Sequence, residues 1–297
     1  MKINTRKEAP VREKNTTLGL LGVLGIWLTA GSALPFVNVL KEFSTPQLMV
    51  CRGLVIGLMA AIGLRGVIRR VDKYTFLIAL VLPFATLCLF EGIRNWGVGP
   101  TIIVITATPL VNLAIGLFSG RQVSRASIIG LVLMLGGVVL ARWGGYFEWP
   151  GFLWSLAGTI LNGILYELFS RAKASSLEKC FWASVGMMTF GFIFTLILNV
   201  GVSWSPIFEP RILALVLGFA FVGGFLYWVA NMLAFENLPT IEVSILAQGE
   251  TPAVIIGAYF LLGERLTLIQ WTGVAISLWG AYFIVRWLSE KPGAAKT

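Results

Sequence analysis

Long apolar segments recur along the whole chain, and most of the charged residues lie in the short stretches between them. A run of about 20 apolar residues is long enough to cross a bilayer as an α-helix. Only 12% of the residues are charged, about half the share found in soluble domains. The alternating segments typical of a transmembrane β-barrel do not occur. The pattern therefore predicts an all-α integral membrane protein with many spans.

The apolar segments predict ten transmembrane helices, near residues 18–40, 45–66, 74–94, 98–119, 124–142, 151–170, 178–200, 211–235, 240–262 and 267–288. The first segment is too long for a signal-peptide core and lacks a clean cleavage site. With this layout, seventeen of the 23 Lys and Arg fall on the side of the N-terminus and six fall elsewhere. Such a bias places both termini in the cytoplasm, and we expect a multi-pass protein of a bacterial-type cytoplasmic (inner) membrane, in contact with membrane lipid.

Several classes of function are disfavoured by the composition. The net charge of +9 comes from basic residues between apolar runs, which indicates topology signals and no nucleic-acid partner. There is no histidine, Asp72 is the only aspartate, and Cys51, Cys88 and Cys180 lack a CxxC spacing, so we expect no metal and no cofactor. An intramembrane enzyme would have few catalytic groups to use. A scaffold or receptor would need more soluble surface than the short loops offer.

An internal repeat relates the two halves of the chain. A shift of 143 residues aligns Thr108-Pro109 with Thr251-Pro252, and seven of the thirty positions 108–137 are then identical. The other identical pairs are Val111 with Val254, Gly120 with Gly263, Gly130 with Gly273, Leu135 with Leu278 and Gly137 with Gly280. Prolines destabilise helix interiors and glycines let helices approach closely, so their coincidence at one offset is informative.

The repeat predicts two five-helix units, residues 1–145 and 146–297. Because five is odd, the second unit would enter the membrane from the opposite side. Inverted repeats recur in transporters, with a substrate site between the halves near the midplane, although channels also contain internal symmetry. We expect Pro109 and Pro252 to bend their helices, and one chain to be sufficient to enclose a site, with an oligomer possible.

A family resemblance rests on the segment Gly263-Glu-Arg-Leu-Thr-Leu-Ile-Gln-Trp-Thr-Gly273. It closely resembles the loop and last helix of EamA-type proteins of the drug/metabolite transporter superfamily. Arg52-Gly-Leu resembles an arginine motif that these proteins often carry in helix 2. The overall sequence is most similar to YddG-type aromatic amino acid exporters. One departure is that the family often has an acidic residue directly before the helix-9 proline, whereas here Glu250 precedes Thr251 and points about 100° away around the helix.

The resemblance implies a secondary transporter that exports amino acids, including aromatic ones, by alternating access. Cationic drugs or other small metabolites on the same fold are the alternative. With the ten predicted helices numbered in chain order, the resemblance also implies that helices 1, 3, 4, 6, 8 and 9 surround the substrate cavity and that helices 5 and 10 are peripheral. Polar and aromatic residues deep in those six helices are the substrate-binding candidates: Trp27, Ser32, Thr108, Asn162, Tyr166, Trp228, Asn231, Gln248 and Glu250.

The candidates match the groups of a free amino acid. Its ammonium could bind Glu250, or the carbonyl groups that prolines leave unpaired; its carboxylate could bind Asn162, Asn231 or threonine hydroxyls. An aromatic side chain could pack on Trp27, Tyr166 or Trp228. The alternative is that such polar residues only bond neighbouring helices, and that Glu250 forms a buried ion pair or is a protonated carboxyl.

Other charged residues have local interpretations. Glu91 could pair with Arg94, Glu167 is expected to lie at the interface beside Arg171, and Arg52 could either line the cavity or extend to the outer surface. Proton coupling would require a carboxylate such as Glu250, and facilitated diffusion explains the sequence equally well.

Overall fold

The computed structural model describes residues 15–65, 71–119, 125–141, 148–197, 203–262 and 267–290. Within these ranges the regular elements are all helical. The first half contains α1 (Thr16–Ala33), α2 (Phe36–Val39), α3 (Thr45–Gly63), α4 (Lys73–Trp96), α5 (Val98–Ile105), α6 (Thr108–Phe118) and α7 (Arg125–Ala141). The second contains α8 (Trp149–Arg171), α9 (Ser176–Ile197), the 3₁₀ turn η1 (Ser205–Phe208), α10 (Pro210–Ala220), the π-helical turn η2 (Phe221–Leu226), α11 (Tyr227–Asn237), α12 (Thr240–Ala247), α13 (Glu250–Leu262) and α14 (Leu268–Glu290).

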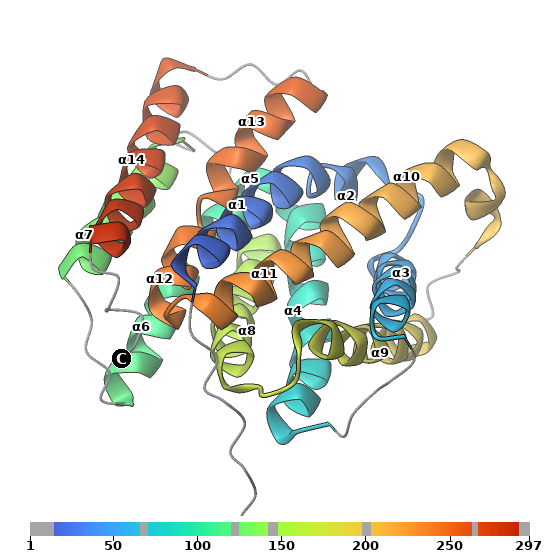
Figure 1. The fold of residues 1–297 in the computed structure, drawn as a ribbon. Helices are drawn as coiled ribbons and strands as arrows, with labels where there is room; N and C mark the ends of the chain where they lie inside the picture. The colour runs from blue at the N-terminus through green and yellow to red at the C-terminus, as the bar shows by residue number, and fades with distance from the viewer. Residues whose placement is uncertain are drawn as a thin grey trace, which may run out of the picture.

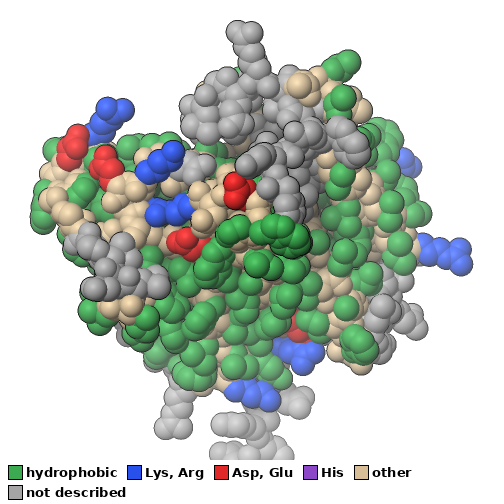
Figure 2. Space-filling model, turned by 180° about the vertical axis from the view of Figure 1, so that it is seen from behind, with side chains coloured by type: hydrophobic (Ala, Val, Ile, Leu, Met, Phe, Trp, Pro, Cys, Tyr) green, Lys and Arg blue, Asp and Glu red, His purple; other side chains and the backbone are tan. Residues whose placement is uncertain are grey.

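The described surface is strongly apolar. Six helices, counting 210–237 as one, are long and apolar enough to cross a membrane. Large side chains on them are exposed, including Leu28 at 74% and Leu196 at 78%, and hydrophobic side chains cover most of the face in Figure 2. Apolar side chains that point outward from helices of this length are expected to face lipid. The chain is therefore a multi-pass membrane protein, as the sequence predicts.

Two of the expected spans are interrupted. Residues 98–119 form α5 and α6, with a break at Thr106–Ala107, and residues 240–262 form α12 and α13, with a break at Gln248–Gly249. Pro109 and Pro252 were expected to bend these spans, and the structure has a short break in the helix just before each proline. The physical reason is the proline that follows each break, because it cannot donate to the carbonyl four residues earlier. At each break the backbone forms tighter turns with hydrogen bonds between residues three apart. Ala107 N donates to Val104 O and Gly249 N donates to Leu246 O, both at 3.0 Å.

The first span also differs from the prediction. It was expected to reach residue 40, but α1 ends at Ala33 and the short α2 follows Pro35. The start of α3 agrees with its sequence, since Ser44 and Gln47 form a reciprocal capping box.

The helices pack mainly in pairs that join the two halves of the chain. α1 packs on α11, α3 on α9, α4 on α8 and α7 on α14. In Figure 1 the α7–α14 pair lies to one side of the other helices. Helices of the first three pairs surround the centre of the molecule, where the candidate site lies.

Close approach of α7 and α14 depends on the glycines of the repeat. A Cβ atom at Gly137 would overlap the backbone nitrogen of Ser277 and lie 2.6 Å from the oxygen of Gly273. A Cβ atom at Gly280 would lie 2.9 Å from the oxygen of Gly130. The contact is thus reciprocal: Gly137 of α7 lies against Gly273 of α14, and Gly280 of α14 lies against Gly130 of α7. The pair Gly120 and Gly263 lies outside the described residues.

We expect Gly137→Ala to lower the free energy of unfolding by about 1–3 kcal/mol, the usual cost of overpacking. Gly136→Ala is the matched control, because a Cβ atom there would meet nothing within 4 Å and alanine is the better helix former. Unfolding of the purified protein in detergent, followed by heat or by added SDS, measures both. Equal stability of the two variants would contradict the close approach.

Asp72 ties the start of α4 to the loop between α8 and α9. Its carboxylate accepts from the backbone nitrogens of Tyr74 at 2.9 Å, Thr75 at 3.1 Å and Ala174 at 3.3 Å. Partial burial acts to raise the pKa of Asp72, but these bonds and one from the Thr75 hydroxyl outweigh burial and lower the pKa below its ordinary value of 3.8. The depressed pKa means that the charged carboxylate stabilises the folded protein.

We expect Asp72→Ala to lower the free energy of unfolding by about 1 kcal/mol at pH 7, as loss of a helix cap does. The stabilisation by a carboxylate of lowered pKa is present above the unfolded pKa and is lost as the pH falls through the folded pKa. The difference from wild type should therefore shrink as the pH falls below 3.8. Asp72→Asn keeps an acceptor for the cap and should lose less. Thermal unfolding across this pH range measures the effect, and a difference that grows in acid would refute it.

Candidate functional site

A cavity that is partly open to solvent lies among helices of both halves, and the centres of water-sized molecules can occupy about 40 Å³ of it. Its wall is formed by α1, α3, α4, α5, α8, α10, η2, α11 and α13, through Ala30, Ala33, Leu34, Arg52, Leu82, Thr86, Leu89, Ile102, Ile105, Asn162, Tyr166, Phe219, Gly223, Tyr227, Trp228 and Glu250. The described parts of α7 and α14 contribute nothing to this wall. The helix α3, which supplies Arg52, is not among the six helices that the family resemblance implied for the cavity.

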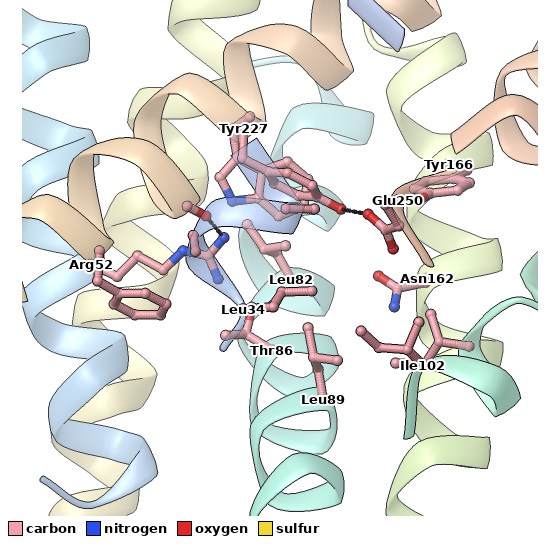
Figure 3. A pocket seen from close by; sticks show the side chains of 16 residues that line it. Leu34, Arg52, Leu82, Thr86, Leu89, Ile102, Asn162, Tyr166, Tyr227 and Glu250 are labelled. Carbon is pink, nitrogen blue, oxygen red and sulfur yellow. Dashed lines mark hydrogen bonds between the residues drawn. The ribbon is translucent and has the colours of Figure 1, made fainter. Parts of the chain in front are cut away.

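Most of the wall is apolar, with a few polar groups at defined positions (Figure 3). Small-molecule sites are typically of this kind, since apolar surface contributes affinity and a few polar groups fix the orientation. The two charged groups of the wall are Arg52 and Glu250. They lie on opposite sides of the cavity in Figure 3, with Tyr227 between them.

Glu250 is the first residue of α13, directly after the break at Gln248–Gly249. Its side chain is only 6% exposed, and Tyr227 donates to its Oε2 at 3.2 Å. Within the described ranges, no Lys or Arg forms an ion pair with it. A carboxylate at a helix N-terminus is favoured by the helix dipole. The break in the helix therefore places an acidic group at the cavity wall without a basic partner in the described part of the protein.

Arg52 lies on α3 and is 4% exposed. Its Nη2 donates to the carbonyl oxygen of Gly223 in η2. Its Cζ lies 5.7 Å from the centre of the Phe90 ring, 5.9 Å from that of Phe219 and 6.0 Å from that of Tyr227. These distances permit cation–π interactions. Of the two open expectations for this residue, the structure supports a position on the cavity wall.

Four of the nine binding candidates lie on this wall: Asn162, Tyr166, Trp228 and Glu250. The other five, Trp27, Ser32, Thr108, Asn231 and Gln248, do not line the cavity. Each donates to a backbone oxygen instead: Trp27 to Leu246 at 2.7 Å, Ser32 to Leu28 at 2.8 Å, Thr108 to Ile105 at 2.6 Å, Asn231 to Tyr227 at 2.9 Å and Gln248 to Ser244 at 2.9 Å. For these five the structure favours the interpretation that they stabilise the helices.

Three polar wall residues are absent from the candidates: Arg52, Thr86 and Tyr227. A signal for Arg52 exists in the sequence, since it is an arginine well inside an apolar span with no acidic residue one turn away. Such a charge is costly unless it has a partner or a function. Tyr227 has the same signal as Trp228, a polar aromatic residue deep in an apolar span, but its bond to Glu250 depends on tertiary packing.

An aromatic layer closes the cavity on the side of the α8–α9 loop. The ring of Tyr166 lies 4.8 Å from that of Phe235, and the ring of Phe169 lies 5.4 Å from that of Trp228 and 5.8 Å from that of Phe235. Tyr166 and Trp228 line the cavity, whereas Phe169 and Phe235 line a second hollow that also contains Lys179. The layer therefore separates the two spaces.

The other charged residues that the structure describes do not line the cavity. Glu167 and Arg171 form the expected pair at 2.6 Å. Arg94 donates to the carbonyl oxygen of Phe43, and Glu91 accepts from Asn95 at 3.2 Å. Glu91 and Arg94 still attract each other electrostatically, as expected, but their side chains form hydrogen bonds to other groups.

Comparison with known proteins gives one family and one fold. Residues 149–286 match the model of the EamA-like transporter family. A segment of 71 residues is 38% identical to the uncharacterized protein y4nH of Sinorhizobium fredii (strain NBRC 101917 / NGR234), and the match spans 22% of this chain and 61% of that protein. A crystal structure with 15% sequence identity superposes with a TM-score of 0.74, covering 90% of this chain and 98% of the other, which shows a shared fold.

The matched range contains the Gly263-Glu-Arg-Leu turn on which the family resemblance rests, although residues 263–266 lie outside the described ranges. Neither of these two similar proteins supports the YddG-type subgroup in particular. Taken with the apolar helical fold, the match makes residues 149–286 of this membrane protein similar to an EamA-like transporter domain.

Proposed function

We propose that the chain is a secondary transporter that exports amino acids, including aromatic ones, across the cytoplasmic membrane by alternating access. The observation that carries the proposal is the central cavity, which combines a mostly apolar wall with a buried carboxylate, Glu250. Transporter sites are typically found where interrupted helices meet near the middle of the membrane. The break before α13 provides such a helix end.

The helix pairing supports an inverted repeat of five helices in each half. Counting α1–α2, α5–α6, α10–α11 and α12–α13 as single spans gives ten. If each span is replaced by the equivalent span of the other half, five places along the chain, the α1–α11 contact becomes the α4–α8 contact. The α3–α9 and α7–α14 contacts each join two equivalent spans and so remain the same. The two broken helices also occupy equivalent places, since a shift of 143 residues moves one break to within one residue of the other.

The wall offers a partner for each part of an amino acid. Glu250 can hold the ammonium group, Asn162 can donate to the carboxylate, and an apolar or aromatic side chain can pack against Leu82, Ile102 or Tyr166. The aromatic layer closes one end of the cavity. In an exporter that layer would have to separate to admit substrate from the cytoplasm, and its closed form corresponds to a state that faces outward.

Export of cationic drugs or other metabolites is the second candidate. It is favoured by Glu250 together with aromatic wall residues, a combination that binds organic cations. The two candidates differ in whether a substrate carboxylate is needed. Proton coupling through a carboxylate and facilitated diffusion are both compatible with the cavity, and a single chain is sufficient to form it.

Flux of labelled amino acids into proteoliposomes, with and without a pH gradient, tests the proposal. We expect uptake of aromatic and large apolar amino acids in excess of protein-free vesicles. Stimulation by the gradient would indicate proton coupling, and equal flux would indicate facilitated diffusion. Flux for none of the amino acids, together with flux of a quaternary ammonium compound, would establish the second candidate instead.

A further inference from the structure

We propose that Arg52 is a binding site for the carboxylate of the substrate, so that the cavity selects zwitterions over simple cations. The inference rests on the proposed function in one respect, which is that this cavity is the transport site. It assigns the substrate carboxylate to a residue of α3 that was expected to face either the cavity or the outer surface.

The first reason is that the Arg52 guanidinium has unused donor capacity. A guanidinium has five N–H groups. In the structure Nη2 donates to Gly223, while Nε is buried and has no hydrogen-bond partner. The surrounding rings of Phe90, Phe219 and Tyr227 can favour the charge, but they accept no conventional hydrogen bond along its edge. Buried donors normally have partners, so an unpaired donor in a side chain that lines a cavity favours a ligand-binding role for that side chain.

The second reason is that no acidic residue in the described part of the chain neutralises Arg52. The other charged wall residue, Glu250, accepts from the Tyr227 hydroxyl at 3.2 Å. The Tyr227 ring in turn lies 6.0 Å from Arg52 Cζ. Tyr227 therefore lies between the two charges, which are on opposite sides of the cavity (Figure 3).

The third reason is the local backbone that receives Arg52. The π-helical turn η2 contains Gly223 and Gly224, and a Cβ atom at Gly224 would lie 3.0 Å from Arg52 Cγ and 3.2 Å from Ile56 Cγ1. The glycines thus leave room for the arginine stem against the turn. Single π turns inside helices are frequently found at functional sites.

A purely structural role would be to fasten α3 to η2 through the bond to Gly223. That role needs one donor and no charge, and a buried charge without a counter-ion is costly. An arginine is better explained by its planar fork, which matches both oxygens of a carboxylate. With Arg52 on one side and Glu250 on the other, the complementary ligand is a small zwitterion with an apolar side chain.

Three ligands of similar shape distinguish the contribution of the substrate carboxylate to binding from that of the ammonium group. Phenylalanine carries both groups, phenylalaninamide keeps the ammonium but lacks the carboxylate, and 3-phenylpropionate keeps only the carboxylate. Binding to purified protein in detergent is measured for wild type and for Arg52→Gln. The matched control is Arg94→Gln, because Arg94 also donates to a backbone oxygen, that of Phe43, but does not line the cavity.

We expect Arg52→Gln to lower the affinity for phenylalanine and for 3-phenylpropionate at least tenfold, and to change the affinity for phenylalaninamide less than threefold. Arg52→Lys should restore part of the loss, and Arg94→Gln should leave the ligand preference unchanged. Gly224→Ala, which crowds the arginine stem without changing its charge, should weaken the same two ligands. An Arg52→Gln protein that binds all three ligands equally less well, or phenylalanine as tightly as wild type, would overturn the inference, as would a wild type that binds none of them.

The outcomes also distinguish this inference from the proposed function. If wild type transports phenylalanine and Arg52→Gln keeps the preference for the carboxylate, the function stands and the Arg52 site is wrong. If wild type moves no amino acid in vesicles but binds 3-phenylpropionate through Arg52, the site stands and amino acid export is wrong.

Discussion

Replacing Glu250 with glutamine is expected to remove most amino acid binding and transport. The glutamine has nearly the same shape and can still accept from the Tyr227 hydroxyl, so the fold should persist. It lacks the charge for the substrate ammonium. Removing one partner of a buried, hydrogen-bonded charge pair costs about 2–5 kcal/mol, which corresponds to a loss of affinity of more than tenfold.

Glu91→Gln is the matched control for this substitution. Glu91 also lies on a membrane helix, but it accepts from Asn95 and does not line the cavity. Flux into proteoliposomes at several pH values and ligand binding in detergent measure both variants. Unchanged flux in Glu250→Gln at every pH would remove this carboxylate from the mechanism.

The second large effect is expected at Gly249, in the break between α12 and α13. A Cβ atom at this position would overlap the indole ring of Trp27, whose Nε1 donates to Leu246 O at 2.7 Å. Gly249→Ala should therefore displace Trp27 from the break and lower the free energy of unfolding by about 1–3 kcal/mol or more. We expect transport to fall as well, because Glu250 follows directly.

Two further variants identify the cause of that effect. Gly218→Ala is the control, since a Cβ atom there would meet nothing within 4 Å. Combining Gly249→Ala with Trp27→Leu should recover part of the stability, because the smaller side chain makes room for the new methyl group. Thermal unfolding in detergent measures wild type, Gly249→Ala, Trp27→Leu, the double variant and Gly218→Ala. If the two substitutions were simply additive, the overlap with Trp27 would not be the cause.

The membrane class and the helical segments could be predicted from sequence because they depend on local hydrophobicity, which the bilayer imposes on every span. The interruptions between α5 and α6 and between α12 and α13 were only partly predictable. Pro109 and Pro252 indicate a bend, but whether a helix bends or breaks depends on the groups that replace the lost backbone bonds. At the second break the Trp27 indole is such a group, and it comes from a helix more than 200 residues away.

The site was harder to predict for a related reason. Depth in the membrane follows from position along a helix, whereas orientation toward the cavity depends on packing angles. Thr108 and Asn231 lie at the right depth, yet they bond to Ile105 and Tyr227 in their own segments. Arg52 was left open because a long side chain can reach either water or the interior, and the space beside Gly224 that receives it exists only in the folded bundle.

The central claim is that substrate passes through the cavity between the two halves, and a thiol placed in its wall tests this most directly. Thr86 lines the cavity and is 4% exposed. Thr86→Cys would be introduced after the three free cysteines, Cys51, Cys88 and Cys180, are replaced by alanine. Ser203→Cys, at an exposed loop position, serves as the control site.

The measurement is amino acid flux before and after reaction with a membrane-impermeant thiol reagent. The proposed mechanism predicts that modification of Thr86→Cys stops flux, that bound phenylalanine slows the modification, and that modification of Ser203→Cys does neither. Complete modification of Thr86→Cys with unchanged flux would contradict it.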